Sequence, residues 1–172
     1  MLSRSALVLC LLSAVACTPH APPSVPATWA SVRDRDSRFE YRLPPQSTPV
    51  GDSACWNLPS RRSNPGSLIC LDEMEQDTAA LQVGWRFRPC STGFADAACY
   101  TEATGDTVAV DGQPLLRVRA LLSGTFGHFK NQPTVLFVIP LPQHRSVLFE
   151  TYLMDPADSA AILRVAGSVR AL

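Results

Sequence analysis

The residues of this sequence best suited to chemistry are its cysteines, because a thiol can be acylated, oxidised to a disulfide or bound to a metal ion. The chain has 172 residues and six cysteines, which are Cys10, Cys17, Cys55, Cys70, Cys90 and Cys99. No two of them have the C-x₂₋₄-C spacing typical of a zinc site, and no histidine lies near the last four. The sequence therefore predicts no metal site and directs attention to acylation and disulfides.

The first sixteen residues have the three parts of a secretory signal peptide. Arg4 supplies the positive charge, and Ala6 to Leu12 form an apolar run. That run is too short to cross a bilayer, which takes about 20 apolar residues. Residues 13–16 carry the short or small side chains that a peptidase needs. We therefore leave residues 1–16 out of the folded protein.

The stretch Ala14-Val15-Ala16-Cys17 resembles the lipobox of bacterial lipoproteins. The resemblance implies that Cys17 takes a diacylglyceryl group and becomes the acylated first residue of the mature chain. Two or more acyl chains anchor a protein stably to a bilayer, whereas one does so only marginally. The alternative is ordinary cleavage, which would leave Cys17 as a free thiol.

Residues 17–28 are the predicted tether, and four prolines follow Cys17 within it. Such a segment favours extended polyproline II, at about 3.1 Å per residue, with a reach of roughly 30 Å. By the sorting habit of lipoproteins, Thr18 after the cysteine implies the outer membrane, with the domain in the periplasm or at the cell surface. The periplasmic side of the inner membrane is the alternative.

Residues 29–172 are expected to form a single globular domain. In an exported chain its four remaining cysteines predict two disulfides, for which three connectivities exist. We favour Cys55–Cys70 and Cys90–Cys99, because each pair closes a local, turn-rich loop.

The domain carries no recognisable catalytic or cofactor motif. There is no G-x-S-x-G, no S-x-x-K in a suitable setting and no glycine-rich phosphate loop. Glu102, Asp106 and Asp111 would be the candidates for glycosidase-type carboxylates, but we interpret them as loop acids. His128 and His144 are expected to be exposed. The sequence therefore predicts a protein that is not an enzyme and holds no cofactor.

Charge in the chain is balanced, with 15 basic and 15 acidic residues, and this predicts no binding to nucleic acid. Arg86 and Arg88 share one strand face, and Arg117 and Arg119 share another. If those strands pair, four guanidinium groups form a patch for phosphate or carboxylate. The alternative is a solvated outer face with its charges offset by nearby acids.

The segment Gly124–Lys130 is a second candidate for binding. Its Phe126, His128 and Phe129 lie among glycines, as in mobile loops that carry binding residues. The alternative is that Phe126 or Phe129 caps the edge of the core.

Alternating or continuous apolar residues predict strands, and Asp111-Gly112 predicts the turn of a hairpin. The expected strands are 38–43, 81–88, 108–110, 115–122, 134–141 and 147–153. Residues 71–80 fit either a short acidic helix or a loop.

The chain ends on a predicted amphipathic helix. Asp155 and Pro156 supply a cap and a first helical position, and Ile162, Val165 and Val169 follow at helical spacing. The predicted fold class is α+β, with an antiparallel sheet of five or six strands, a C-terminal helix packed on it and two disulfides.

Three segments resemble PsbP-like domains, several of which occur on bacterial envelope lipoproteins. They are "RFEYRLP", "VAVDGQPLLRVRA" and "SVLFETYLMDPADSAAILRVAGSVRAL". The resemblance implies an α/β/α sandwich and a mostly non-enzymatic role in assembly or binding. The chain departs from the family after the first segment, where prolines and Cys55 favour a stapled loop.

Together these features predict a lipid-anchored, non-catalytic envelope protein that binds or assembles with another envelope protein. The alternative is a binding protein for a lipid, cell-wall or other anionic ligand, and a cavity of several hundred Å³ between sheet and helix would favour it. A hydrolase with an unrecognised site is a third interpretation.

Replacing Cys17 tests the anchor. The Cys17→Ala variant is expected to leave the membrane fraction, because it has no thiol to acylate, while Cys10→Ala should fractionate as wild type does. Membrane fractionation with immunoblotting measures both. A Cys17→Ala protein that stays with the membrane contradicts the lipobox assignment.

Overall fold

The computed structural model describes residues 24–33, 38–52, 54–60, 66–79, 99–110, 112–123 and 132–172. Its strands are β1 (Ala30–Arg33), β2 (Phe39–Leu43), β3 (Thr48–Pro49), β4 (Cys55–Asn57), β5 (Leu68–Glu75), β6 (Cys99–Val110), β7 (Gln113–Ser123), β8 (Gln132–Leu141), β9 (Arg145–Leu153) and β10 (Arg170–Ala171). A 3₁₀ turn, η2 (Pro156–Asp158), leads into the helix α2 (Ser159–Gly167).

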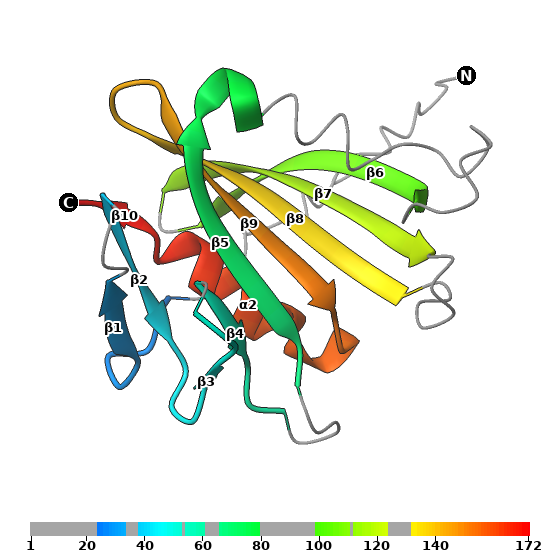
Figure 1. Cartoon of the computed structure of the whole chain (residues 1–172), viewed down its shortest axis with the longest axis horizontal. Coiled ribbons are helices and arrows are strands. Elements are labelled where there is room, and N and C mark those ends of the chain that lie inside the picture. Colours follow the sequence, from blue (N-terminus) through cyan, green and yellow to red (C-terminus); the bar gives the residue numbers. More distant parts are fainter. Residues whose placement is uncertain are drawn as a thin grey trace, which may run out of the picture.

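The strands form two antiparallel sheets (Figure 1). The large sheet has seven strands in the order β3-β4-β5-β9-β8-β7-β6, and the small sheet has three in the order β1-β2-β10. The α+β class is confirmed, but the prediction of one sheet of five or six strands is wrong. Strands β3, β4 and β10 are only two or three residues long, too short to show a period of two in the sequence.

The core lies between the large sheet and a layer made of α2 and the small sheet (Figure 1). We call the face of the large sheet toward α2 its inner face, and the opposite one its outer face. Phe137 and Phe149 meet on the inner face with their ring centroids 5.5 Å apart. Phe39 and Tyr41 of β2 join the same buried cluster as Ile162 of α2. One continuous core therefore holds both sheets and the helix together.

The helix begins as its sequence predicts. The Asp155 carboxylate accepts a hydrogen bond of 2.9 Å from the Ala157 backbone N–H, and Pro156 stands at the first position. Ile162 and Val165 are buried, as is Val169 just beyond the helix. The predicted apolar stripe is thus the surface that packs on the sheet.

Gly167 lets the end of α2 approach β6. A Cβ atom at this position would lie 1.9 Å from Cγ1 of Val110, which is fully buried and has a stiff, β-branched side chain. Any larger residue would push the helix off the sheet.

The strands predicted over 38–43, 134–141 and 147–153 are confirmed as β2, β8 and β9. The hairpin about Gly112 is confirmed as β6 and β7, with Gly112 at φ 79°, although β6 begins nine residues before the predicted strand. Residues 71–75 continue β5, and a helical turn follows at 76–79. The strand predicted over 81–88 lies outside the described residues.

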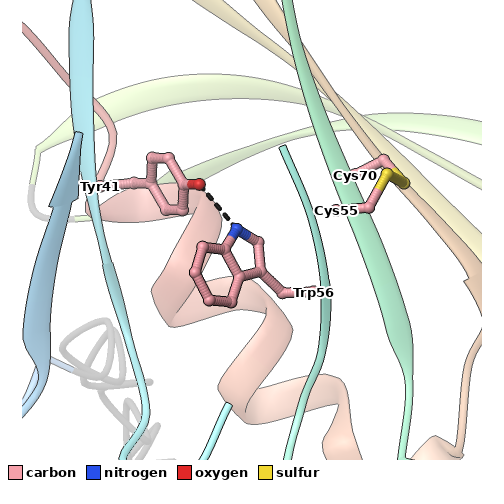
Figure 2. Close-up of a disulfide and its surroundings, with 4 residues drawn as sticks. All are labelled: Tyr41, Cys55, Trp56 and Cys70. Carbon is pink, nitrogen blue, oxygen red and sulfur yellow. Dashed lines mark hydrogen bonds between the residues drawn. A yellow bond between two sulfur atoms is a disulfide. The ribbon is translucent and has the colours of Figure 1, made fainter. Parts of the chain in front are cut away.

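One disulfide, Cys55–Cys70, is confirmed (Figure 2). The two residues face each other across the β4–β5 ladder with their Cα atoms 4.1 Å apart. Next to the disulfide, the Trp56 indole N–H donates a hydrogen bond of 2.8 Å to the Tyr41 hydroxyl. The disulfide therefore fixes β4 to the large sheet, and Trp56 connects β4 to the small one. The predicted pair Cys90–Cys99 lies outside what the structure describes, because it includes Cys90.

Removal of this disulfide should lower stability without changing the fold. Closing a loop of this length contributes about 3 kcal/mol in the chain-entropy model, so we expect the Cys55→Ala/Cys70→Ala protein to lose that order of unfolding free energy. Urea unfolding under oxidising conditions measures the loss.

Adding a reductant then distinguishes the contributions of the two predicted disulfides to stability. In the Cys55→Ala/Cys70→Ala protein, any further loss of stability on reduction reports on Cys90 and Cys99 alone. An unfolding free energy equal to that of wild type would show that the Cys55–Cys70 bridge does not constrain the chain.

Candidate ligand-binding site

The inner face of the large sheet changes from apolar to charged along one row of residues. Phe149 of β9 faces Phe137 of β8, which faces Arg117 of β7, which in turn faces Asp106 of β6. The two phenylalanines are buried in the core. The guanidinium and carboxylate take the last two places in the row, toward the edge strand β6. The charges thus lie where the core ends.

Arg117 and Asp106 form a forked ion pair. The Arg117 Nε donates to Oδ1 of Asp106 at 2.9 Å, and its Nη2 donates to Oδ2 at 2.5 Å. This hydrogen bonding holds the pKa of Asp106 below its ordinary value of 3.8, with added attraction from Arg119. It also raises the pKa of Arg117 above its ordinary value. Both groups stay charged at neutral pH.

Arg119 is held far less closely than Arg117. Its Nη2 lies 3.6 Å from Oδ2 of Asp106, and its side chain is 54% exposed, against 23% for Arg117. Two guanidinium groups thus share one carboxylate. The cluster carries one net positive charge, and Arg119 is the group with capacity for another partner.

A pocket of about 430 Å³ lies beside these arginines, between the sheet and the helix. We call it the inner pocket. Its described lining residues are Arg117, Arg119, Val135, Phe137, Met154, Ser159, Ala160, Ile162 and Leu163. β7 and β8 form one wall, and the first half of α2 forms the other. The volume falls within the range of roughly 300–1,000 Å³ that small-molecule sites occupy.

Hydrogen bonds from β9 position the sheet side of the inner pocket. The buried Thr151 hydroxyl accepts a bond of 2.7 Å from the Val135 N–H and donates one of 2.9 Å to the Val135 carbonyl. The Met154 N–H donates to the Pro133 carbonyl at 3.3 Å. These bonds hold Val135 and Met154 in place independently of any ligand.

Comparison with known proteins finds similarity to solved structures. No family model matches the chain, and no curated protein does. The chain is similar to the solution structure of cyanobacterial PsbP (CyanoP) from Synechocystis sp. PCC 6803, with a TM-score of 0.49 and 14% sequence identity. The match covers 87% of this chain and 98% of that one. At this level of similarity the match assigns neither a family nor a function to this chain.

Within the described residues, β7 pairs with β6 on one edge and with β8 on the other. The patch of four arginines stays a prediction. Arg86 and Arg88 themselves lie outside the described residues. The neighbour that offsets Arg117 is Asp106.

The alternative for Arg117 and Arg119 was a solvated outer face with charges offset by nearby acids. Asp106 does offset both charges and Arg119 is exposed, but the two arginines share the inner face with the buried Leu115. The intervening Val118 packs on the outer face with Leu136 and Leu148. At the centre of β7 the outer face is therefore apolar, whereas the inner face carries the two arginines.

The remaining predicted site residues are either exposed or outside the described residues. His144 is exposed in the turn between β8 and β9, at φ 57°, as expected for a loop histidine. Glu102 is exposed on β6. Asp111, Cys17 and the loop with Phe126, His128 and Phe129 lie outside the described residues.

Asp106 does not have the environment of a glycosidase acid. A general acid needs a raised pKa, whereas Arg117 lowers that of Asp106. Within the described part of the chain, no three His, Cys, Asp or Glu side chains are grouped so as to bind a metal ion. In the same residues, no helix is both long and apolar enough to cross a bilayer.

The apolar half of the inner pocket could not be predicted from the sequence. In the sequence, Val135 and Phe137 are ordinary strand residues, and Leu163 is part of a helix. A usable signal was the alternation of Leu115, Arg117, Arg119 and Leu121, which places two arginines in line with core positions.

The Asp106–Arg117 pair predicts a pH-dependent contribution to stability. Because the folded pKa of Asp106 lies below the unfolded value, the contribution is complete above about pH 4 and is lost as the pH falls through the lowered pKa. The pair is partly exposed, so we expect Asp106→Asn to cost less than about 1 kcal/mol at pH 7.

Urea unfolding of wild type and Asp106→Asn at pH 7, 5 and 3 measures the difference between their unfolding free energies. The difference should be smaller at pH 3 than at pH 7, and smaller at high salt. Glu102→Gln, which removes an exposed carboxylate of the same strand, is the matched control. A difference that persists unchanged at pH 3 would contradict the ion pair as its cause.

Proposed function

We propose that this chain is a lipid-anchored, non-catalytic protein of the cell envelope whose domain binds a small ligand in the inner pocket. The observation that supports ligand binding is the pocket itself, about 430 Å³ in volume and set between β7, β8 and α2. A cavity between sheet and helix is the feature that favours a ligand-binding protein over a purely protein-binding one.

The chemistry of the inner pocket suits binding and not catalysis. Its described ionisable residues are Arg117 and Arg119, and a guanidinium neither gives up nor accepts a proton at physiological pH. The Ser159 hydroxyl donates a hydrogen bond of 2.5 Å to the Pro156 carbonyl, so its proton is directed at the backbone of η2. The described lining can therefore orient a charged group but has no group placed to transfer a proton.

The anchor is proposed on the sequence of the N-terminus. Cys17 stands at the position that a lipoprotein acylates, and a proline-rich segment separates it from β1. We place the domain at the outer membrane, facing the periplasm or the cell surface, and the bridge between Cys55 and Cys70 supports an oxidising compartment.

A second candidate function is the binding of another envelope protein, and a groove on the outer face favours it. This groove, also about 430 Å³, is lined by Leu116 and Val138 together with Pro114 and Pro140. Leu116 is 43% exposed, one of two large apolar side chains that are exposed within the described residues. Exposed apolar area of this kind is found where proteins contact one another.

Filling the inner pocket tests the ligand-binding proposal. Ala160 is exposed and lines the pocket, so Ala160→Trp should occupy the space with little cost to the core. Ala157→Trp, at an exposed position of η2 that is not among the lining residues, is the matched control.

The measurement is native mass spectrometry of each protein purified from envelopes. We expect a bound small molecule with wild type and with Ala157→Trp, and its loss with Ala160→Trp. Equal occupancy in all three would contradict the inner pocket as the site. Recovery of one envelope protein with all three, and of no small molecule, would favour the second candidate.

A further inference from the structure

The inner pocket joins one unbalanced positive charge to an apolar lining. We propose that its ligand is an amphipathic anion, with one carboxylate or phosphate head group bound by Arg119 and an apolar tail lying between β8 and α2. This inference rests on the proposed function, and it adds the chemical class of the ligand.

The first step is the assignment of the head group to Arg119. Both branches of the Arg117 fork that face β6 are taken by Asp106, whereas Arg119 has a single contact to that carboxylate, at 3.6 Å. A half-exposed guanidinium keeps most of its five donors for water or a ligand. A carboxylate or phosphate can accept two of them at once. Arg117 then serves as a positioning residue that keeps Asp106 away from the ligand.

The second step excludes the helix as the anion site. Its first turn lines the pocket through Ser159 and Ala160, but acids already occupy its start. Asp155 accepts from the Ala157 N–H, and the buried Asp158 accepts from the backbone N–H and hydroxyl of Ser67, at 3.1 and 2.8 Å. Two carboxylates offset the positive end of the helix. The charge that attracts an anion is therefore that of the arginines.

The third step concerns the tail. The partly buried Met154 and Leu163 supply thioether and aliphatic surface to the pocket, above a floor of the buried Val135, Phe137 and Ile162. Methionine is flexible and polarisable, so it adapts to tails of different shape. A sugar or a nucleotide would leave most of its hydrogen-bonding groups unpaired against such a lining. An alkyl or aryl tail has no hydrogen bonds to water that it would lose on entering this lining.

The charge count also limits the head group. Two guanidinium groups and one carboxylate leave a single excess positive charge. A carboxylate balances it, and a phosphate monoester, with about 1.5 to 2 negative charges at neutral pH, more than balances it, whereas a cationic amphiphile is repelled by it. A neutral amphiphile gains only from the apolar lining.

Four probes that share one tail test these statements on the full mature chain carrying Cys17→Ser. Decanoate and decyl phosphate carry the two candidate head groups, 1-decanol is the neutral analogue and decyltrimethylammonium is the cation. Titration calorimetry below micelle-forming concentrations should show both anions binding roughly 10- to 100-fold more tightly than 1-decanol, because they add hydrogen bonds to a charged group. The tighter of the two anions identifies the head group.

Variants of Arg119 locate the head group. Arg119→Gln should weaken the anions to about the level of 1-decanol and leave 1-decanol itself unchanged, which also shows that the variant is folded. Arg119→Lys should keep most of the preference for anions. Arg33→Gln, on β1 of the small sheet, is the matched control and should behave as wild type does.

The results separate this inference from the proposed function. If 1-decanol binds as tightly as both anions and Ala160→Trp abolishes binding of all three, the pocket stands and the anionic class is wrong. Anion binding that is unchanged in Arg119→Gln overturns the assignment of the head group. If no probe binds to wild type, both the class of ligand and the pocket as its site are wrong.

Discussion

The structure depends on one constraint: the inner face of the large sheet must be covered, and within the described residues the nine-residue helix α2 and a three-stranded sheet cover it. Where α2 lies on the sheet, Phe137 and Ile162 are almost fully buried. The end of the helix approaches β6 closely at Gly167, against Val110. Farther along β7 the cover given by the described residues is incomplete: Arg119 is 54% exposed, beside the inner pocket that the first half of α2 forms with β7 and β8.

The polar residues of the inner face follow from this incomplete cover. A charge placed in the middle of the sheet would lose its hydration, at a cost of several kcal/mol. At the edge, Arg117 and Asp106 keep part of their contact with water, at 23% and 37% exposure, and pair with each other. An ion pair in this position costs little to form, and it leaves Arg119 beside an apolar surface. The arrangement that suits an amphipathic ligand is thus a consequence of how far the helix reaches.

The small sheet adds the connection between this layer and the start of the domain. Tyr41 of β2 is buried and accepts the hydrogen bond from Trp56 of β4, beside the disulfide that fixes β4 (Figure 2). The described chain starts next to this sheet, because Ser24 and Val25 line a cleft of about 270 Å³ together with Glu40 and Arg42. In an anchored protein, the tether would therefore meet the domain at the small sheet.

Local patterns in the sequence were sufficient to predict β2, β8, β9, the β6–β7 hairpin and α2, and to pair Cys55 with Cys70. Each of these depends on neighbours in sequence: a period of two, a glycine at a turn, a capping aspartate or a short loop. The short strands, the second sheet and the inner pocket depended on the tertiary structure. Arg119, Val135 and Leu163 are far apart in the chain, and only the strand register and the seating of α2 bring them together. In the sequence the same arginines fitted either a basic patch or a solvated face, because alternation shows that two residues share a face but not whether a helix covers it.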